Sequence, residues 1–290
     1  MSAASTPAGN AAAAAHASHS AASGTPHDAP AGKPLTGRHA VVTGGGKGIG
    51  MAIARHLLAH GAAVTLVGRD RDTLDRAVAD LTPLGQVQAA ACDVVDAASV
   101  RTAFDGAAQA FGPIAVLVNN AGQAVSERFD RMDASVWDTM LAVNLTGTFH
   151  CTQAVLPGML AQQWGRVVNV ASTAGLIGYA YVSAYCAAKH GVIGMTRALA
   201  LEVARKGVTV NAVCPGYTET DIVRGAVANI VGKTGMTEEA ARAQLAQRNP
   251  QGKLVQPDDV AQTVAWLCLP AAMAVNGQAI PVDGGEVMTG

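Results

Sequence analysis

Residues 40–58 read Ala-Val-Val-Thr-Gly-Gly-Gly-Lys-Gly-Ile-Gly-Met-Ala-Ile-Ala-Arg-His-Leu-Leu. An apolar run, a glycine-rich turn and a helical pattern follow one another, which predicts a strand, a loop and a helix. Glycines let a backbone approach a phosphate closely, and free N–H groups at a helix start favour an anion. The strict GxGxxG spacing is not met, and glycine-rich turns also serve only as bends. In this context we expect a pyrophosphate site formed by Thr43, Gly44, Gly46, Lys47, Gly48, Ile49 and Gly50.

On both sides of this stretch, short apolar runs alternate with segments of helical length. Most of these runs are as long as a strand that is buried on both faces. The alternation predicts an α/β fold, a single doubly wound Rossmann-type domain over residues 35–290 whose seven-stranded parallel sheet has helices on both faces. Ligands of such sheets bind beyond the carboxyl ends of the strands. The expected strands are 40–42, 63–67, 87–91, 114–118, 167–170, 208–213 and 279–282.

Composition excludes several classes of protein. The chain has 290 residues, with 20 Lys and Arg against 21 Asp and Glu, and the formal net charge of -1 disfavours a nucleic-acid binder. No apolar run approaches the roughly 20 residues that a membrane-spanning helix requires. The five cysteines are odd in number and form no CxxC pair, so we expect buried free thiols, no metal site and a cytoplasmic location.

The first 34 residues are rich in Ala, Ser, Gly, Pro and Thr. No large aliphatic side chain occurs between Met1 and Leu35, so this segment cannot bury enough area to offset the entropy of ordering it. It has neither the features of a secretory signal nor those of a mitochondrial presequence. We therefore predict a disordered low-complexity tail over residues 1–34.

Further motifs follow the glycine loop in a fixed order, and together they resemble the short-chain dehydrogenase/reductase family over almost all of residues 35–290. The glycine pattern is TGxxxGIG, and a YxxxK pair lies near the middle of the chain. The resemblance is closest to 3-oxoacyl thioester reductases and polyketide ketoreductases. It implies a nicotinamide cofactor and oxidoreductase activity. The matching residues are Asn119-Asn120-Ala121-Gly122, Asn144, Ser172, Tyr185, Lys189 and Pro215-Gly216.

The end of the second expected strand bears on the choice of cofactor. Gly68 stands where NAD-preferring members of the family carry an acidic residue, and the guanidinium of the adjacent Arg69 suits a 2′-phosphate. Lys47 lies in the glycine loop and adds a second cation. The pattern favours NADP(H), although Asp70 and Asp72 dilute the positive charge and NAD(H) stays possible. The resemblance also assigns Asp93, Val94, Asn120, Ala121, Gly122, Tyr185, Lys189, Pro215, Gly216 and Thr218 to the cofactor site, with a turn cap as the alternative for Asp93.

Tyr185 and Lys189 are four residues apart in a helical pattern, so both side chains lie on one helix face. A free tyrosine has a pKa of about 10 and is a poor acid near neutral pH. Lowering that pKa by three units takes about 4 kcal/mol, which a cation about 4 Å away supplies at an effective dielectric near 20. An isolated YxxxK spacing also fits ordinary surface packing. Together with the other matching motifs, it predicts that Tyr185 transfers the proton and that the Lys189 ammonium lowers its pKa.

Two more residues complete the expected catalytic set. Ser172 follows a strand, and its hydroxyl is suited to hold a substrate carbonyl oxygen beside Tyr185. The resemblance implies that Asn144 lies in a helix and holds a water that connects Lys189 to solvent. An asparagine bonded to nearby backbone is the alternative. The implied reaction is hydride transfer between the nicotinamide and a carbonyl carbon, with no metal.

The resemblance also bears on substrate and assembly. Residues 217–252 correspond to the family's substrate lid, and the favoured reaction is reduction of a 3-oxoacyl-CoA or 3-oxoacyl-carrier-protein. An NAD-dependent dehydrogenase of a 3-hydroxyacyl-CoA, sugar, steroid or other secondary alcohol is the alternative. A methyltransferase needs no YxxxK pair, and a catalytically silent relative would lack the reacting groups. Helices with apolar residues on two sides, such as the one containing Ala198-Leu199-Ala200-Leu201, usually pack against two neighbours. In the family that the chain resembles, such helices pair between subunits, so the resemblance implies a homotetramer.

Overall fold

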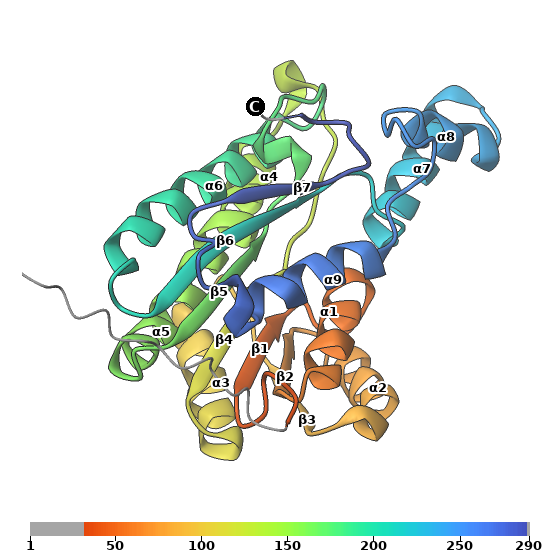
Figure 1. The fold of residues 1–290 in the computed structure, drawn as a ribbon. Coiled ribbons are helices and arrows are strands. Elements are labelled where there is room, and N and C mark those ends of the chain that lie inside the picture. Colours follow the sequence, from red (N-terminus) through yellow and green to blue (C-terminus); the bar gives the residue numbers. More distant parts are fainter. Residues whose placement is uncertain (1–31, 289–290) are drawn as a thin grey trace, which may run out of the picture. The chain divides into compact units, whose positions relative to one another are not determined.

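Seven parallel strands form one sheet in the computed structural model, which describes residues 32–288 (Figure 1). The strand order is β3-β2-β1-β4-β5-β6-β7, so the chain builds outward from β1, returns to pair β4 against β1, and continues in the other direction. This order confirms the predicted doubly wound fold. The strands are β1 (His39–Thr43), β2 (Ala63–Gly68), β3 (Val87–Ala91), β4 (Ile114–Asn119), β5 (Gly165–Val170), β6 (Val208–Pro215) and β7 (Ala279–Val282).

Successive side chains of the central strands enter two different cores. Val42, Leu66 and Val118 pack into one core, whereas Val41 and Leu117 pack into the other. Both sets are buried because helices cover both faces of the sheet, and apolar β-branched residues suit a strand in that position. The first core is covered by α1 (Gly48–Ala59), α2 (Arg71–Leu81) and α9 (Pro257–Cys268), the second by α3 (Ala97–Phe111), α5 (Gly147–Ala161) and α6 (Ser183–Val203) (Figure 1).

Three further helices frame the end of the sheet where the expected site residues lie. The short helix α4 (Ala134–Leu141) packs on α6 and continues through a π-helical segment, η3 (Ala142–Thr146), into α5. Helices α7 (Asp221–Thr234) and α8 (Glu238–Ala246) pack on each other through a small apolar cluster that contains Val227 and Leu245. Figure 1 shows these two helices as an outlying pair that precedes α9.

A disordered tail was predicted for residues 1–34, and residues 1–31 of it lie outside the described part of the chain. All five cysteines are buried and free, which confirms that interpretation of the thiols. Among residues 32–288, no helix is both long and apolar enough to cross a membrane.

Candidate active site

The switch point between β1 and β4 brings together the glycine loop and the Asn119-Asn120-Ala121-Gly122 segment. Thr43 is buried at the end of β1, and its Oγ1 accepts hydrogen bonds from the N–H groups of Asn120 (2.9 Å) and Ala121 (3.0 Å). The side-chain amide of Asn120 donates to the carbonyl oxygen of Thr43 at 2.9 Å. Thr43 therefore joins the two loops to each other, and its hydroxyl has no lone pair left for an easy contact with a ligand.

The glycine loop fits a phosphate group in this structure. Gly44 has a φ of +64°, in the left-handed region that favours glycine. A Cβ on Gly50 would lie 2.3 Å from the Gly44 carbonyl oxygen, so this close approach of loop and helix requires glycine. The N-cap of α1 is Lys47, whose side chain makes no capping bond, and the first N–H groups of α1 therefore have no side-chain acceptor. Uncapped N–H groups at a helix start are suited to phosphate oxygens.

The two cations expected near the cofactor differ in their surroundings. The Lys47 ammonium lies 2.6 Å from the carboxylate of Asp221, the first residue of α7, which also pairs with Arg224. Lys47 is therefore paired with the first residue of α7. The sequence had suggested instead that its ammonium stands free beside the glycine loop. Arg69 is exposed and forms no ion pair within residues 32–288, and the neighbouring Asp70 caps α2 by accepting from the Thr73 N–H.

The segment after β3 has a clear local role. The carboxylate of Asp93 accepts a hydrogen bond from the Val95 N–H at 3.1 Å, so the turn-cap interpretation is observed for this side chain. Val94 is buried, and a Cβ on Gly147 would lie 2.7 Å from its side chain. Gly147 thus allows α5 to pack closely on the segment where the adenine contact is expected.

Asn144 is fully buried at the centre of the π-helical segment. Its amide nitrogen donates to the backbone oxygens of Gln123 and Met140, both at 3.0 Å, and its Oδ1 accepts from the Gln123 N–H at 3.2 Å. A π segment widens one helical turn and often marks a functional position. A Cβ on Gly122 would lie 2.8 Å from Asn144 Oδ1 and 3.7 Å from Lys189 Nζ. Gly122 therefore lies next to both the Asn144 amide and the Lys189 ammonium, at a point where a side chain would crowd the amide.

Ser172, Tyr185 and Lys189 converge beyond the carboxyl end of β5. Tyr185 and Lys189 lie one turn apart near the start of α6, and the Lys189 Nζ is 5.6 Å from the centre of the Tyr185 ring. The Lys189 ammonium also donates to the Val170 carbonyl oxygen at 2.8 Å, which fixes the side chain against the end of β5. The Ser172 side chain lies beside that of Tyr185 and acts to lower the Tyr185 pKa. Ser172 Oγ accepts in addition from the Ala174 N–H at 3.1 Å.

Burial controls the charges of this group. It raises the pKa of Tyr185 to about 12, and the Ser172 side chain offsets only part of that effect. Burial likewise lowers the pKa of Lys189 to about 8. In the protein alone burial outweighs any lowering of the Tyr185 pKa by Lys189, which is itself buried and has a lowered pKa. The phenol therefore keeps its proton near neutral pH.

The segment after β6 lies beside the end of β7 and beside the glycine loop. The Gly216 N–H donates to the Val282 carbonyl oxygen at 3.1 Å, and the buried Thr218 donates its hydroxyl to the Gly216 carbonyl oxygen at 3.0 Å. A Cβ on Gly48 would lie 3.5 Å from the Thr220 side chain. The beginning of the 217–252 segment therefore lies next to the glycine loop, with Pro215 at the end of β6 directly before it.

The sequence did not indicate a polar cluster that lies beside Ser172. The hydroxyl of Tyr179 bonds to Thr173 Oγ1 at 2.8 Å and to Glu286 Oε1 at 2.7 Å. Arg248 lies over the Tyr179 ring, 4.8 Å from its centre. These residues come from distant parts of the chain and follow no local pattern, so only the tertiary structure brings them together.

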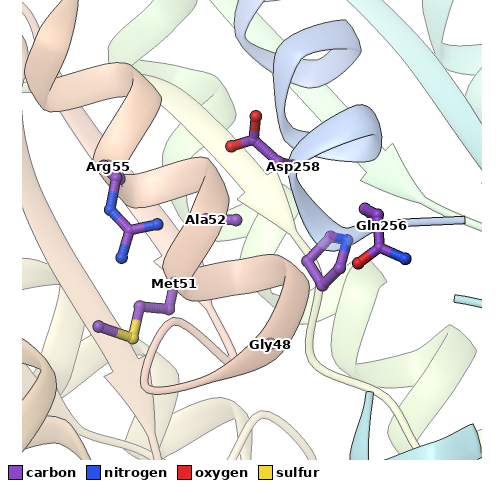
Figure 2. A pocket seen from close by; sticks show the side chains of 7 residues that line it. Gly48, Met51, Ala52, Arg55, Gln256 and Asp258 are labelled. Carbon is purple, nitrogen blue, oxygen red and sulfur yellow. The ribbon is translucent and has the colours of Figure 1, made fainter. Parts of the chain in front are cut away.

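A shallow depression of about 220 Å³ lies between the start of α1 and the start of α9 (Figure 2). It is lined by Gly48, Arg55 and Asp258, among others, and contains none of the reacting residues. Figure 2 shows Gly48 at the N-terminal end of α1 and Asp258 on α9, facing the depression from two sides. It lies on the outer side of the glycine loop, whereas the residues that are expected to react lie near the carboxyl ends of β4, β5 and β6.

Comparisons with known proteins agree with this geometry. A family model described as short chain dehydrogenase matches residues 38–230. A putative ketoacyl reductase of the granaticin polyketide synthase from Streptomyces violaceoruber is 41% identical over 258 residues, which cover 88% of this chain and 93% of the relative. A D-beta-hydroxybutyrate dehydrogenase from Cupriavidus necator is 40% identical, with 87% of this chain and 99% of the relative covered.

A solved structure has the same fold. It is the crystal structure of a variant of actinorhodin polyketide ketoreductase with NADPH, with a TM-score of 0.83 and 38% sequence identity. The match covers 86% of this chain and 97% of that one. The two chains therefore share their architecture over nearly the whole described part of this protein.

Proposed function

Because the chain belongs to the short-chain dehydrogenase family of oxidoreductases, we propose that it reduces a 3-oxoacyl thioester, on CoA or on an acyl carrier protein, to the 3-hydroxyacyl thioester. The observation that carries this proposal is the convergence of Ser172, Tyr185 and Lys189 beyond β5, at the same sheet edge as the glycine loop. A hydroxyl pair with a buried cation behind it is suited to polarise a ketone.

NADP(H) is the proposed cofactor, and when bound it supplies or accepts the hydride. The N–H groups at the start of α1 hold its pyrophosphate, and Gly44, Gly46, Gly48, Ile49 and Gly50 let the backbone approach it. The exposed guanidinium of Arg69 would pair with a 2′-phosphate and so favour NADP(H) over NAD(H). The structural relative crystallised with NADPH supports this choice. The rest of the cofactor site is formed by Asp93, Val94, Asn120, Ala121, Gly122, Pro215, Gly216 and Thr218.

Each side chain of the site has its own role in the proton transfer. Tyr185 delivers its proton to the carbonyl oxygen, because its raised pKa keeps the phenol protonated in the pH range of the cell. Ser172 donates a second hydrogen bond to that oxygen. Lys189 holds positive charge below the phenol, and Asn144 keeps the Gly122-Gln123 backbone in place beside Lys189. The 217–252 segment covers the substrate.

A second candidate is the dehydrogenation of a small 3-hydroxy acid or another secondary alcohol with NAD. It is favoured by the similarity to D-beta-hydroxybutyrate dehydrogenase, which is almost as high as that to the ketoacyl reductase. The two candidates use the same reacting residues and differ in the group attached one methylene away from the ketone.

A substrate and cofactor panel tests the proposal. Acetoacetyl-CoA, acetoacetate and simple ketones are assayed with NADPH and with NADH. We expect the highest kcat/KM for the thioester with NADPH, and a large preference for NADH would contradict the role of Arg69. In the same assay Tyr185→Phe should lose at least about 100-fold in kcat, since general acid catalysis contributes 10² or more. Cofactor binding, followed by NADPH fluorescence, should persist in this variant, and a loss of both would point to misfolding.

The proposed assembly is a homotetramer in the cytoplasm. Phe149 on α5 is 44% exposed and Leu201 on α6 is 81% exposed, so both helices present large apolar side chains on their outer sides. Large apolar side chains on the outer sides of α5 and α6 would be buried if these helices pair between subunits. The free thiols suit a reducing compartment. Light scattering after gel filtration should give four times the mass of one chain, and a monomer mass would contradict the assembly.

A further inference from the structure

Three chain segments that are far apart in the sequence meet beside the reacting residues. Tyr179 lies in the loop between β5 and α6, Arg248 follows α8, and Glu286 lies in the turn after β7. The Tyr179 hydroxyl lies 2.7 Å from Glu286 Oε1, across 107 residues of sequence, and 2.8 Å from Thr173 Oγ1. Two hydrogen bonds therefore connect the Glu286 carboxylate to the residue next to Ser172.

The second carboxylate oxygen of Glu286 lies beside the segment that follows β6. A Cβ on Gly216 would lie 3.3 Å from Glu286 Oε2. The ring of Tyr217, the next residue, is perpendicular to that of Tyr179 with 6.2 Å between their centres. Since Gly216 follows β6 and Ser172 follows β5, two neighbouring strands, the carboxylate lies at the same sheet edge as the reacting hydroxyls.

The charges of this cluster are screened unequally. The Glu286 side chain is only 7% exposed, whereas that of Arg248 is 49% exposed. Arg248 Nη1 lies 3.8 Å from Glu286 Oε1, so the pair is held loosely. Water screens an exposed charge more strongly than a buried one. The negative charge of Glu286 is therefore felt in the cleft more than the positive charge of Arg248.

We propose that Glu286 is a specificity-determining residue that selects uncharged 3-oxoacyl esters and thioesters over free 3-oxo acids. This inference rests on the proposed function, in which Ser172 and Tyr185 hold the ketone oxygen. The group that carries or lacks the charge is one methylene away from the ketone, and the inference requires that this side of the substrate faces Tyr179 and Glu286, which lie at the same sheet edge as Ser172. A substrate carboxylate is repelled there, and a thioester is not. Glu286 thus favours the ketoacyl reductase reaction on thioesters and disfavours the dehydrogenase reaction on free hydroxy acids.

Two substrates with one carbon skeleton test the inference. Acetoacetate and its N-acetylcysteamine thioester share the 3-oxo group, but the thioester carries an uncharged and larger group in place of the carboxylate, and the ratio of their kcat/KM values with NADPH is compared between the wild type and the variants. The wild type should prefer the thioester. Glu286→Gln retains an oxygen that accepts from Tyr179 but removes the charge, and the preference should fall by about tenfold or more, equivalent to about 1.4 kcal/mol. Arg248→Met leaves the carboxylate uncompensated, and the preference should rise.

Glu202→Gln is the matched control, because it removes an exposed carboxylate from α6 and should leave the ratio unchanged. If Glu286 served only to join the chain segments, Glu286→Gln would reduce kcat/KM for both substrates equally and lower the melting temperature, and the inference would be overturned. A wild type that prefers acetoacetate would overturn it as well. Should Glu286→Gln fail to fold, the direction of the change in Arg248→Met, at an exposed side chain, decides.

The failure of this inference is distinct from that of the proposed function. If the wild type reduces simple ketones but neither acetoacetyl compound, the proposed function fails and the inference falls with it. If the thioester is reduced well and the ratio does not change in Glu286→Gln, the proposed function stands and only the role of Glu286 is wrong.

Discussion

The charges of Tyr185 and Lys189 depend more on burial than on the groups nearest to them. Lys189 loses hydration on entering the protein and, within residues 32–288, regains one hydrogen bond, to the Val170 carbonyl oxygen. Desolvation disfavours the charged form of a lysine, so its pKa falls. The same burial raises the pKa of Tyr185, because for a phenol the charged form is the deprotonated one. At neutral pH the cleft therefore holds a protonated phenol above an ammonium that is close to titrating.

The titration of Lys189 should be visible in the pH dependence of carbonyl reduction. Its pKa of about 8 means that the ammonium loses its proton as the pH rises through that value. We expect kcat/KM for the 3-oxoacyl thioester to fall above about pH 8, since this parameter reports the pKa values of the free enzyme. A guanidinium stays protonated throughout this range. In Lys189→Arg the residual activity should lack the break near pH 8, and a break at an unchanged position would exclude Lys189 as its origin.

The same pKa shift affects stability in a defined direction. The folded-state pKa of about 8 is below the ordinary value of 10.5, so the unfolded chain binds more protons between these two values. Stability rises with pH wherever the unfolded state binds more protons. The contribution of Lys189 to the free energy of unfolding is thus least favourable below about pH 8 and improves toward pH 10.

At the scale of elements, the site depends on how α4 and α5 are joined. The π-helical segment places Asn144 in the interior, where its amide bonds to the backbone of Gln123 and Met140. The segment after β4 is thereby fixed against the helix. Gly122 is the point of closest approach, because no side chain fits between that segment, Asn144 and Lys189.

Gly122→Ala tests this junction. The added Cβ would lie 2.8 Å from Asn144 Oδ1, so the amide must shift and weaken its bond to the Gln123 N–H. Overpacking of this kind costs about 1–3 kcal/mol, and we expect that loss in the free energy of unfolding, measured with urea, together with reduced kcat. Gly106→Ala in α3 is the control. Its Cβ meets nothing within 4 Å, and it should stabilise the helix by about 0.5–1 kcal/mol. Equal effects of the two substitutions would contradict the role of Gly122.

For the whole molecule, local pattern predicted most of the fold and part of the site. The seven strands, the glycine loop and the Tyr185–Lys189 spacing are properties of neighbouring residues, so apolar periodicity and short motifs are sufficient to predict them. The Glu286–Tyr179 bond spans 107 residues, and no local pattern indicates it. The pKa directions of Tyr185 and Lys189 were also beyond the sequence, because they depend on burial by distant segments.

The bond between Lys47 and Asp221 is another long-range feature that the sequence did not indicate, and it connects the glycine loop to α7. Both side chains are exposed, 69% and 47%, so the pair adds little to stability. It does place a carboxylate beside the proposed pyrophosphate site and neutralises a cation there. We therefore expect Asp221→Asn to bind NADPH more tightly, with a Kd lower by about two- to fivefold and an almost unchanged melting temperature, because Lys47 is released toward the phosphates.

Fluorescence titration of NADPH at low and high ionic strength measures this effect and its electrostatic origin. The difference between Asp221→Asn and the wild type should shrink in about 1 M salt, where the screening length falls to about 3 Å. Asp130→Asn, which removes a carboxylate from the exposed pair with Arg128, is the control and should leave the Kd unchanged. Weaker binding in Asp221→Asn would mean that the pair orders α7 over the cofactor and that this ordering outweighs the repulsion between the carboxylate and the phosphates.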